Sequence, residues 1–108
     1  MRRYAGDGAA RLAALGEPTR LRLAALLAVE GEACVCHLAA AIGAPDFKVS
    51  RHLGVLRAAG LVEARRRGTW MHYRLTPPRD ALAQRLRAML RDCVDVRRER
   101  VRLSKAAC

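Results

Sequence analysis

The sequence predicts a mainly α-helical domain with one small β-hairpin. Hydrophobic residues make up 52% of the 108 residues and aromatic residues only 4%, so we expect an aliphatic core built from helices. The alternation of apolar and polar residues that is typical of strands is concentrated in residues 61–75, which limits the sheet to a short segment. A chain of this length fits a single domain that spans residues 1–108.

The first half of the chain contains two predicted helices. The stretch "PTRLRLAALLAVEG" has Pro18 in its first turn and stops at Gly31, which indicates a helix of about three turns. The stretch "ACVCHLAAAIG" starts with β-favouring Val35 between two cysteines and continues as a helix to Gly43. The two cysteines therefore lie where an extended segment enters a helix.

A third helix and a hairpin follow. Residues 46–59 have Asp46 as the expected N-cap, an apolar stripe at helical spacing and a glycine beyond the end. Residues 62–75 alternate on both sides of Gly68, which accepts the positive φ that a tight hairpin needs. Two short helices followed by a basic hairpin form a winged helix-turn-helix, with residues 46–59 as the reading helix and residues 62–75 as the wing.

The C-terminal part is predicted to form one long helix over about residues 79–103. Its apolar residues recur at spacings of four and three, which is the pattern of an amphipathic helix. This stripe has more apolar surface than a small domain can cover alone, so we expect a homodimer with a helical interface. The predicted dimer-interface residues are Leu82, Leu86, Met89, Cys93 and Val96.

The charge of the chain predicts a polyanionic partner. The formal net charge is +11 and the sequence pI is about 11.1, and each Lys or Arg placed against a phosphate releases a counterion. We therefore expect binding to double-stranded DNA. The candidate DNA-binding residues are Lys48, Ser50, Arg51, His52 and Arg57 in the reading helix and Arg65, Arg66 and Arg67 in the wing.

The sequence carries no signal for a membrane or for catalysis. It has no apolar run long enough to span a bilayer and no secretory signal, so we expect a cytoplasmic protein without a membrane partner. It also lacks the βαβ pattern and the C-x-x-C motif that usually accompany thiol oxidoreductase chemistry. We expect no enzyme activity, no catalytic residues and no catalytic cofactor.

The motif with ligand-binding chemistry is the pair Cys34 and Cys36, followed by His37. Soft trivalent arsenic and antimony prefer sulfur ligands over oxygen or nitrogen. Two sulfurs at positions i and i+2 do not share a helix face, so they converge on one ion only if the segment is extended or unwinds. We expect such unwinding to distort the helix that supports the reading helix.

The stretch "CVCHLAAAIGAPDFKVSRHLGVLRAAGLVEARRRGTWMHYRL" resembles the arsenic-responsive branch of the ArsR/SmtB metal-sensing repressors, which carry C-V-C, S-R-H-L, L-x-x-x-G-L and a wing ending in H-Y-R-L. The resemblance extends from Glu17 to Pro77. It implies a homodimeric repressor that leaves its operator when arsenite, methylarsenite or antimonite binds to thiols. Cys34 and Cys36 match the first two thiols of the family's C-V-C-x-x-C site, whereas Ala39 stands at the third position.

The sequence leaves the third ligand open. Cys93 on the predicted interface, which we rank first, or Cys108 near the C-terminus could supply it; alternatively the site has two thiols only and favours a methylated arsenical. His37, which replaces the family's usual aspartate, suggests zinc, but its neighbours in the sequence supply no fourth ligand. Two alternatives within the same family are a redox-sensing repressor that forms intersubunit disulfides and a zinc- or cadmium-responsive repressor.

Overall fold

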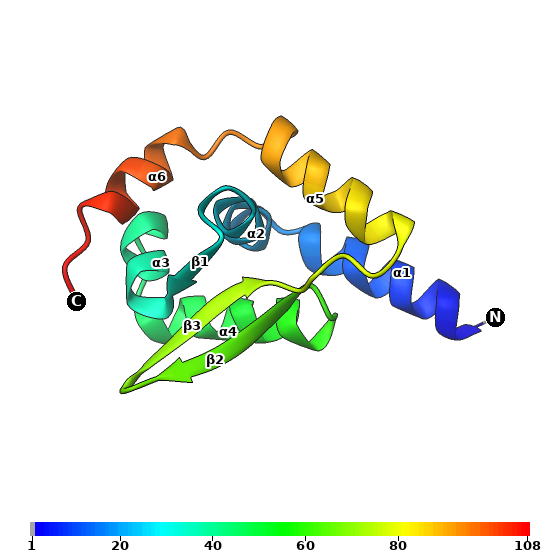
Figure 1. Cartoon of the computed structure of the whole chain (residues 1–108), viewed down its shortest axis with the longest axis horizontal. Coiled ribbons are helices and arrows are strands. Elements are labelled where there is room, and N and C mark those ends of the chain that lie inside the picture. The colour runs from blue at the N-terminus through cyan, green and yellow to red at the C-terminus, as the bar shows by residue number, and fades with distance from the viewer. Residues whose placement is uncertain (1) are drawn as a thin grey trace.

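The structure, a computed structural model, describes residues 2–108, with side chains from residue 8 onward. Its elements run in the order α1 (Arg2–Leu15), α2 (Pro18–Glu30), β1 (Glu32–Cys34), α3 (Val35–Ile42), α4 (Asp46–Ala58), β2 (Val62–Arg67), β3 (Trp70–Leu75), α5 (Ala81–Cys93) and α6 (Arg97–Ser104) (Figure 1). The predicted mainly helical fold with a small hairpin is confirmed. None of the helices in the described part of the chain is both long and apolar enough to cross a membrane.

The sheet has three antiparallel strands in the order β1-β3-β2. Strands β2 and β3 form the predicted wing, which turns at Gly68 with a φ of 62°. Strand β1 adds to the other edge of β3, and its last residue, Cys34, pairs with His72. The sheet therefore fixes the first cysteine of the motif directly against the wing.

The core is aliphatic and is centred on α2, around which the other elements lie (Figure 1). Its most buried large side chains, each 0–2% exposed, are Leu23, Leu26, Leu27, Leu38, Val49, Leu53, Leu56 and Leu90. Burial of one such side chain stabilises the fold by about 1.5–3 kcal/mol. Because these residues come from α2, α3, α4 and α5, the same core positions the thiol-bearing helix and the reading helix.

The turn between α3 and α4 is short and has well-defined caps. Gly43 ends α3 with the left-handed φ of 81°, and its N–H donates to the carbonyl of Ala39 at 2.8 Å. Pro45, rather than the expected Asp46, is the N-cap of α4, because its extended backbone (φ −63°, ψ 151°) precedes the first helical residue. Asp46 instead lies in the first turn, where its negative charge suits the helix dipole.

Helix α1 and strand β1 are not among the predicted elements. The N-terminal segment contains Gly6 and Gly8, which lower helix propensity, yet α1 forms and packs against α2 and α4. Strand β1 has three residues, too few to show alternation, and its partner β3 lies some 40 positions further along the chain. Both elements depend on tertiary contacts that the local pattern does not contain.

The predicted single helix over residues 79–103 is wrong, because the chain breaks between α5 and α6. Val94 is extended (φ −111°, ψ 119°), and the Asp95 carboxylate accepts a hydrogen bond from the backbone N–H of Arg97 at 3.0 Å. Short side chains such as Asp offer the backbone this alternative to helical bonding. Val96 then enters the core at 4% exposed, and α6 turns back to pack on α3 (Figure 1).

Candidate thiol site and DNA-binding surface

The thiols of Cys34 and Cys36 lie side by side, with 3.5 Å between their Sγ atoms. Cys34 is the N-cap of α3 and keeps an extended backbone (φ −84°, ψ 160°), whereas Cys36 lies in the first helical turn. Both residues are buried, at 5% and 8% exposed. The expected condition for convergence, an extended entry to the helix, is therefore met, and the unwinding that we expected on binding is not needed.

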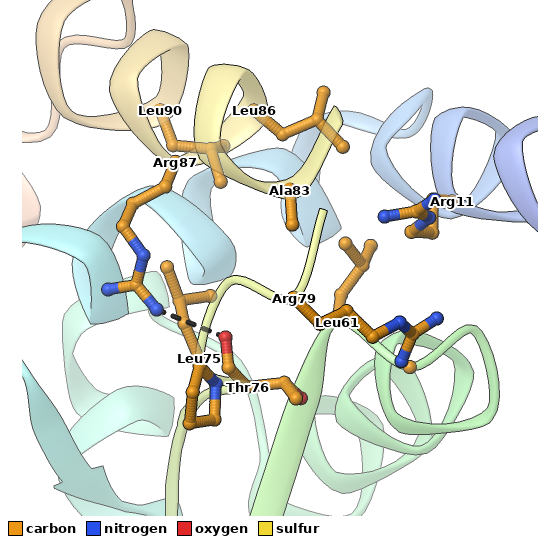
Figure 2. Close-up of a pocket in the computed structure, with 11 residues that line it drawn as sticks. Arg11, Leu61, Leu75, Thr76, Arg79, Ala83, Leu86, Arg87 and Leu90 are labelled. Carbon is orange, nitrogen blue, oxygen red and sulfur yellow. Dashed lines mark hydrogen bonds between the residues drawn. The ribbon is translucent and has the colours of Figure 1, made fainter. Parts of the chain in front are cut away.

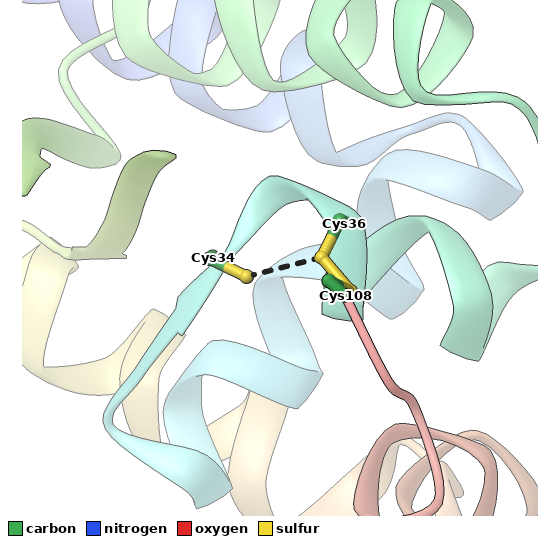
Figure 3. Close-up of a disulfide and its surroundings, with 3 residues drawn as sticks. All are labelled: Cys34, Cys36 and Cys108. Atoms are coloured by element: carbon green, nitrogen blue, oxygen red, sulfur yellow. Dashed lines mark hydrogen bonds between the residues drawn. A yellow bond between two sulfur atoms is a disulfide. The ribbon is translucent and has the colours of Figure 1, made fainter. Parts of the chain in front are cut away.

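Cys108 joins this pair from the far end of the chain. The tail after α6 returns to α3, where Cys108 forms a disulfide with Cys36 across 72 positions of sequence (Figure 3). Cys93, which the sequence ranked first as a further ligand, lies exposed at the end of α5 and outside the cluster. The break before α6 explains the difference, since a continuous helix would carry the C-terminus away from α3.

His37 completes a cluster of four potential ligands. Its ring nitrogen and the sulfurs of Cys34, Cys36 and Cys108 all lie within 4.8 Å of one another. Cys108 is exposed and His37 is half-buried, so the cluster is open on the side of the tail. In the disulfide form two of the sulfurs are bonded to each other, and a two-electron reduction provides three thiols.

A groove beside the cluster connects it with the elements expected to contact DNA. Its walls come from α3 and the α3–α4 turn, from the tail residues Ala106, Ala107 and Cys108, from Asp46 at the start of α4 and from Trp70 on the wing. Trp70 is 40% exposed. Any group bound at the thiols therefore lies close to the N-terminal end of the reading helix and to the wing.

The exposed side of α4 carries most of the predicted DNA-binding residues of the reading helix. Lys48, Ser50, Arg51 and Arg57 are exposed there, and Arg65 and Arg66 are exposed on the wing. Phe47 was not predicted, yet it is 62% exposed at the start of α4. The sequence could have indicated it, because Phe47 is an aromatic residue that lies outside the apolar stripe of its helix. An exposed aromatic side chain at this position can contact a thymine methyl group.

Two predicted DNA-binding residues have partners within the protein. His52 is half-buried, with its Nδ1 atom 3.8 Å from the Glu17 carboxylate and 3.4 Å from the guanidinium of Arg20. Arg67, the last residue of β2 before the turn of the wing, forms an ion pair with Glu32 of β1 at 3.3 Å. Both side chains therefore connect elements of the fold: His52 links α4 with the start of α2, and Arg67 links β2 with β1.

The predicted dimer-interface residues fall into two groups. Leu86 and Val96 are 8% and 4% exposed and belong to the protomer's own core. Leu82 and Met89 are half-buried against that core, and Cys93 is exposed. The periodic stripe therefore covers the protomer itself at Leu86 and Val96, because α5 lies across α2 instead of standing free.

Arginines and apolar side chains line a small cavity between α1, the end of the wing and α5 (Figure 2). Arg11, only 5% exposed, donates two hydrogen bonds of 3.1 Å to the Asp80 carboxylate, and Arg87 donates to the carbonyl of Thr76 at 3.1 Å. The hydrogen bonds from Arg11, and then that from the backbone of Ala83, lower the pKa of Asp80. The cavity measures about 30 Å³, which suits water rather than an organic ligand.

The fold and its basic surface define a winged helix-turn-helix protein of the DNA-binding kind. Residues 17–64 match the family described as "Bacterial regulatory protein, arsR family". The chain is 45% identical over 85 residues to an arsenic resistance transcriptional regulator of Pseudomonas putida, a match that covers 79% of this chain and 64% of that protein. It is 44% identical over 72 residues to the arsenical resistance operon repressor of Escherichia coli, covering 67% and 62%. The chain thus spans less than two thirds of the length of these relatives.

Solved structures give the same assignment. A homodimeric winged helix-turn-helix domain from Mycobacterium bovis, described as a possible ArsR-family regulator, has a TM-score of 0.72 and 33% identity, covering 82% of this chain and 79% of that one. The antimony-specific transcriptional repressor AntR has a TM-score of 0.66 and 36% identity, covering 80% and 76%. The chain belongs to the ArsR family, and its fold and relatives are those of DNA-binding transcriptional regulators, not of enzymes.

Proposed function

We propose that the chain is a homodimeric transcriptional repressor that binds operator DNA and releases it when trivalent arsenic or antimony binds to Cys34, Cys36 and Cys108. The observation that carries this proposal is the meeting of three cysteines from one chain beside the reading helix and the wing. The names of the relatives, two arsenic resistance regulators and an antimony-specific repressor, support the choice of ligand.

The ligand chemistry follows from the sulfur set. Trivalent arsenic is soft and forms three bonds to sulfur, so three thiols satisfy it where two do not. Arsenite as As(OH)₃ reacts with three thiols to give As(SR)₃ and three waters, without any change in oxidation state. The Cys36–Cys108 disulfide must first be reduced by a cellular thiol. Cys108 thus takes the place of the third thiol that Ala39 does not provide.

The DNA contacts follow from exposure. The N-terminal part of α4 enters the major groove, where Lys48, Ser50 and Arg51 reach base edges and phosphates. Arg65 and Arg66 at the tip of the wing contact the flanking backbone or minor groove. A dimer presents two such surfaces to two half-sites, and linking two half-sites strengthens binding beyond that of either alone.

The tail couples the two sites. Ala106, Ala107 and Cys108 share one groove with Asp46 of the reading helix and Trp70 of the wing. A metalloid that ties Cys108 to Cys34 and Cys36 fixes the tail in this groove. The ligand then interacts differently with the DNA-bound and released conformations, as an inducer must.

The test is fluorescence anisotropy of labelled upstream promoter DNA with reduced protein at constant salt. Arsenite and antimonite are expected to release DNA from the wild type and from the matched control Cys93→Ser, which alters a cysteine outside the cluster. They should fail with Cys108→Ser, and methylarsenite, which needs only two thiols, should still bind to Cys34 and Cys36 of that variant but should not release its DNA, because the tail is no longer tied to α3. Release of Cys108→Ser by arsenite at the wild-type concentration would exclude Cys108, and no release of the wild type by any of the three would overturn the proposal.

The disulfide supports a second candidate, a redox-sensing repressor. Peroxide would convert two thiols into the Cys36–Cys108 disulfide and two waters, within one protomer and not between subunits as the sequence had suggested. DNA release by peroxide that dithiothreitol reverses, lost in Cys108→Ser, would support this function. Unchanged DNA affinity after complete oxidation of the pair would reject it.

A further inference from the structure

We propose that Glu32 competes with DNA phosphate for Arg67, so that this one carboxylate sets how much of the positive charge of the wing reaches DNA. In the free protein the Glu32 carboxylate holds the Arg67 guanidinium at 3.3 Å. Arg67 binds a phosphate only after it has left Glu32. The inference rests on the proposed contact of the wing with DNA, and it is independent of which ligand binds at the thiols.

Glu32 and Arg67 lie on the same face of the sheet. Alternate residues of β3, from Trp70 to Arg74, share the face that is turned away from the core. Glu32 of β1 pairs with Arg74, and Arg67 of β2 pairs with Trp70, so both side chains belong to this face. Four positions of β3 separate the two pairs. The Arg67 side chain therefore reaches back along the wing to contact Glu32, away from the turn.

The other two arginines of the wing are not held in this way. Arg65 and Arg66 are exposed, and neither forms an ion pair with a residue whose side chain the structure describes. The side chain of Arg67 is 52% exposed, and an ion pair so open to water is weak. Duplex DNA carries a dense array of phosphates and releases counterions when arginine binds, so a phosphate can replace Glu32 as the partner of Arg67.

His72 provides Glu32 with a second partner when Arg67 leaves. Its Nδ1 atom lies 3.5 Å from the Oε2 atom of Glu32, the same oxygen that Arg67 contacts. With a hydrogen on Nδ1, the ring donates to that oxygen. The carboxylate of Glu32 is only 26% exposed, and a half-buried carboxylate without a donor is unfavourable. His72 therefore makes the exchange of Arg67 from Glu32 to DNA easier.

The strand that carries Glu32 also carries the first cysteine of the thiol site. Glu32 and Cys34 are two positions apart on β1, and Cys34 pairs with His72 of β3. A shift of β1 against β3 therefore changes the distance between Glu32 and Arg67 directly. The competition for Arg67 is thus a point at which an event at the thiols alters the affinity of the wing for DNA.

The test is a double-mutant cycle of Glu32→Gln and Arg67→Ala, measured by anisotropy on operator DNA and on random duplex DNA at constant salt. Glu32→Gln keeps the size of the side chain and removes its charge. It should bind DNA about two- to fivefold more tightly for each wing, the factor expected from one solvent-exposed ion pair. The same substitution should have no effect in the Arg67→Ala background. Arg67→Ala alone should reduce the slope of log affinity against log salt by about one for each wing.

Glu63→Gln is the matched control. Glu63 lies on the same face of the sheet, but it pairs with Arg74 at 2.6 Å, further from the turn of the wing. The control removes the same charge and leaves the contact between Glu32 and Arg67 intact, so it should change DNA affinity less than Glu32→Gln does. An equal gain from Glu32→Gln with and without Arg67 would show that Glu32 merely repels DNA, and would overturn the proposal. Weaker DNA binding by Glu32→Gln would also reject it, because Glu32 would then position Arg67 for DNA.

Failure of the proposed repressor function gives a different result from failure of this inference. Random DNA supplies the phosphates for the cycle, so the cycle is measurable even if the operator is not preferred or if arsenite does not release it. Nitrogen-15 NMR of the Arg67 guanidinium in the DNA-free protein measures the contact with Glu32 itself. Rotation about the Cζ–N bonds should be slower in the wild type than in Glu32→Gln, and equal rotation in the two proteins would rule out the contact and the competition.

Discussion

The conformation of one residue, Cys34, decides the character of the thiol site. Its extended backbone at the N-cap of α3 turns its sulfur toward Cys36, which a helical residue at that position would not do. In the reading helix, too, the direction of a side chain decides what it can contact. Arg51 faces solvent, whereas its neighbour His52 points toward Glu17. Adjacent residues of one motif therefore have different surroundings: the side chain of Arg51 is in solvent, and that of His52 contacts other parts of the fold.

Arg51→Ala is expected to weaken operator binding by about 1–3 kcal/mol, because an exposed arginine near the N-terminus of a reading helix is placed to bind a guanine edge. Anisotropy titrations with operator and with random DNA of equal length measure the effect. Arg91→Ala, which removes an exposed arginine near the end of α5, on a different face from Leu82 and Met89, is the control of equal charge. An equal loss on both DNAs would show that Arg51 contacts only phosphate.

At the scale of elements, the sequence predicts those helices and strands that are determined by a local pattern of residues. The reading helix, expected over residues 46–59, spans Asp46–Ala58, and the wing lies within the expected residues 62–75. The pairing of β1 with β3, the break at Asp95 and the return of Cys108 to α3 depend on contacts between distant segments. Two ligands of the candidate site, Cys34 and Cys36, could thus be predicted as a pair, whereas the position of Cys108 could not.

The junction of α1 and α5 should be sensitive to acid. Asp80 caps α5, accepting from the N–H of Ala83 at 2.8 Å, and binds buried Arg11 of α1. Because these hydrogen bonds hold the pKa of Asp80 below its usual 3.8, the carboxylate stabilises the fold fully above about pH 4. This stabilisation is lost as the pH falls through the lowered pKa.

Urea unfolding of the wild type and of Asp80→Asn between pH 7 and pH 2 measures this contribution. The variant should be less stable at neutral pH, and its free energy of unfolding should fall less steeply in acid. Asp92→Asn, which alters an exposed carboxylate near the end of α5, is the matched control. Parallel acid limbs for the wild type and Asp80→Asn would contradict the assignment.

At the scale of the whole molecule, the exposed apolar residues differ from those that the periodicity of the C-terminal segment predicts. Leu86 and Val96 are used in the protomer's own core, whereas Leu12 of α1 and Val101 of α6 are 55% and 53% exposed. Helix α1 meets the start of α5, where Arg11 pairs with Asp80, whereas α6 follows the other end of α5 and packs on α3 (Figure 1). Exposed Leu12 of α1, together with half-buried Leu82 of α5, which lies beside Gly8 of α1, is therefore our better candidate for the dimer interface.

Leu12→Asp is expected to give monomers, because it places a charge at the exposed apolar residue of the proposed interface, and to weaken operator binding as a result. Val101→Asp introduces the same charge at an equally exposed apolar residue of α6 and should remain dimeric. Light scattering after size-exclusion chromatography gives the mass of each variant, and anisotropy gives its affinity. Dissociation of Val101→Asp with an intact Leu12→Asp dimer would move the interface to α6, next to the thiol site, and would make the tail part of the subunit contact.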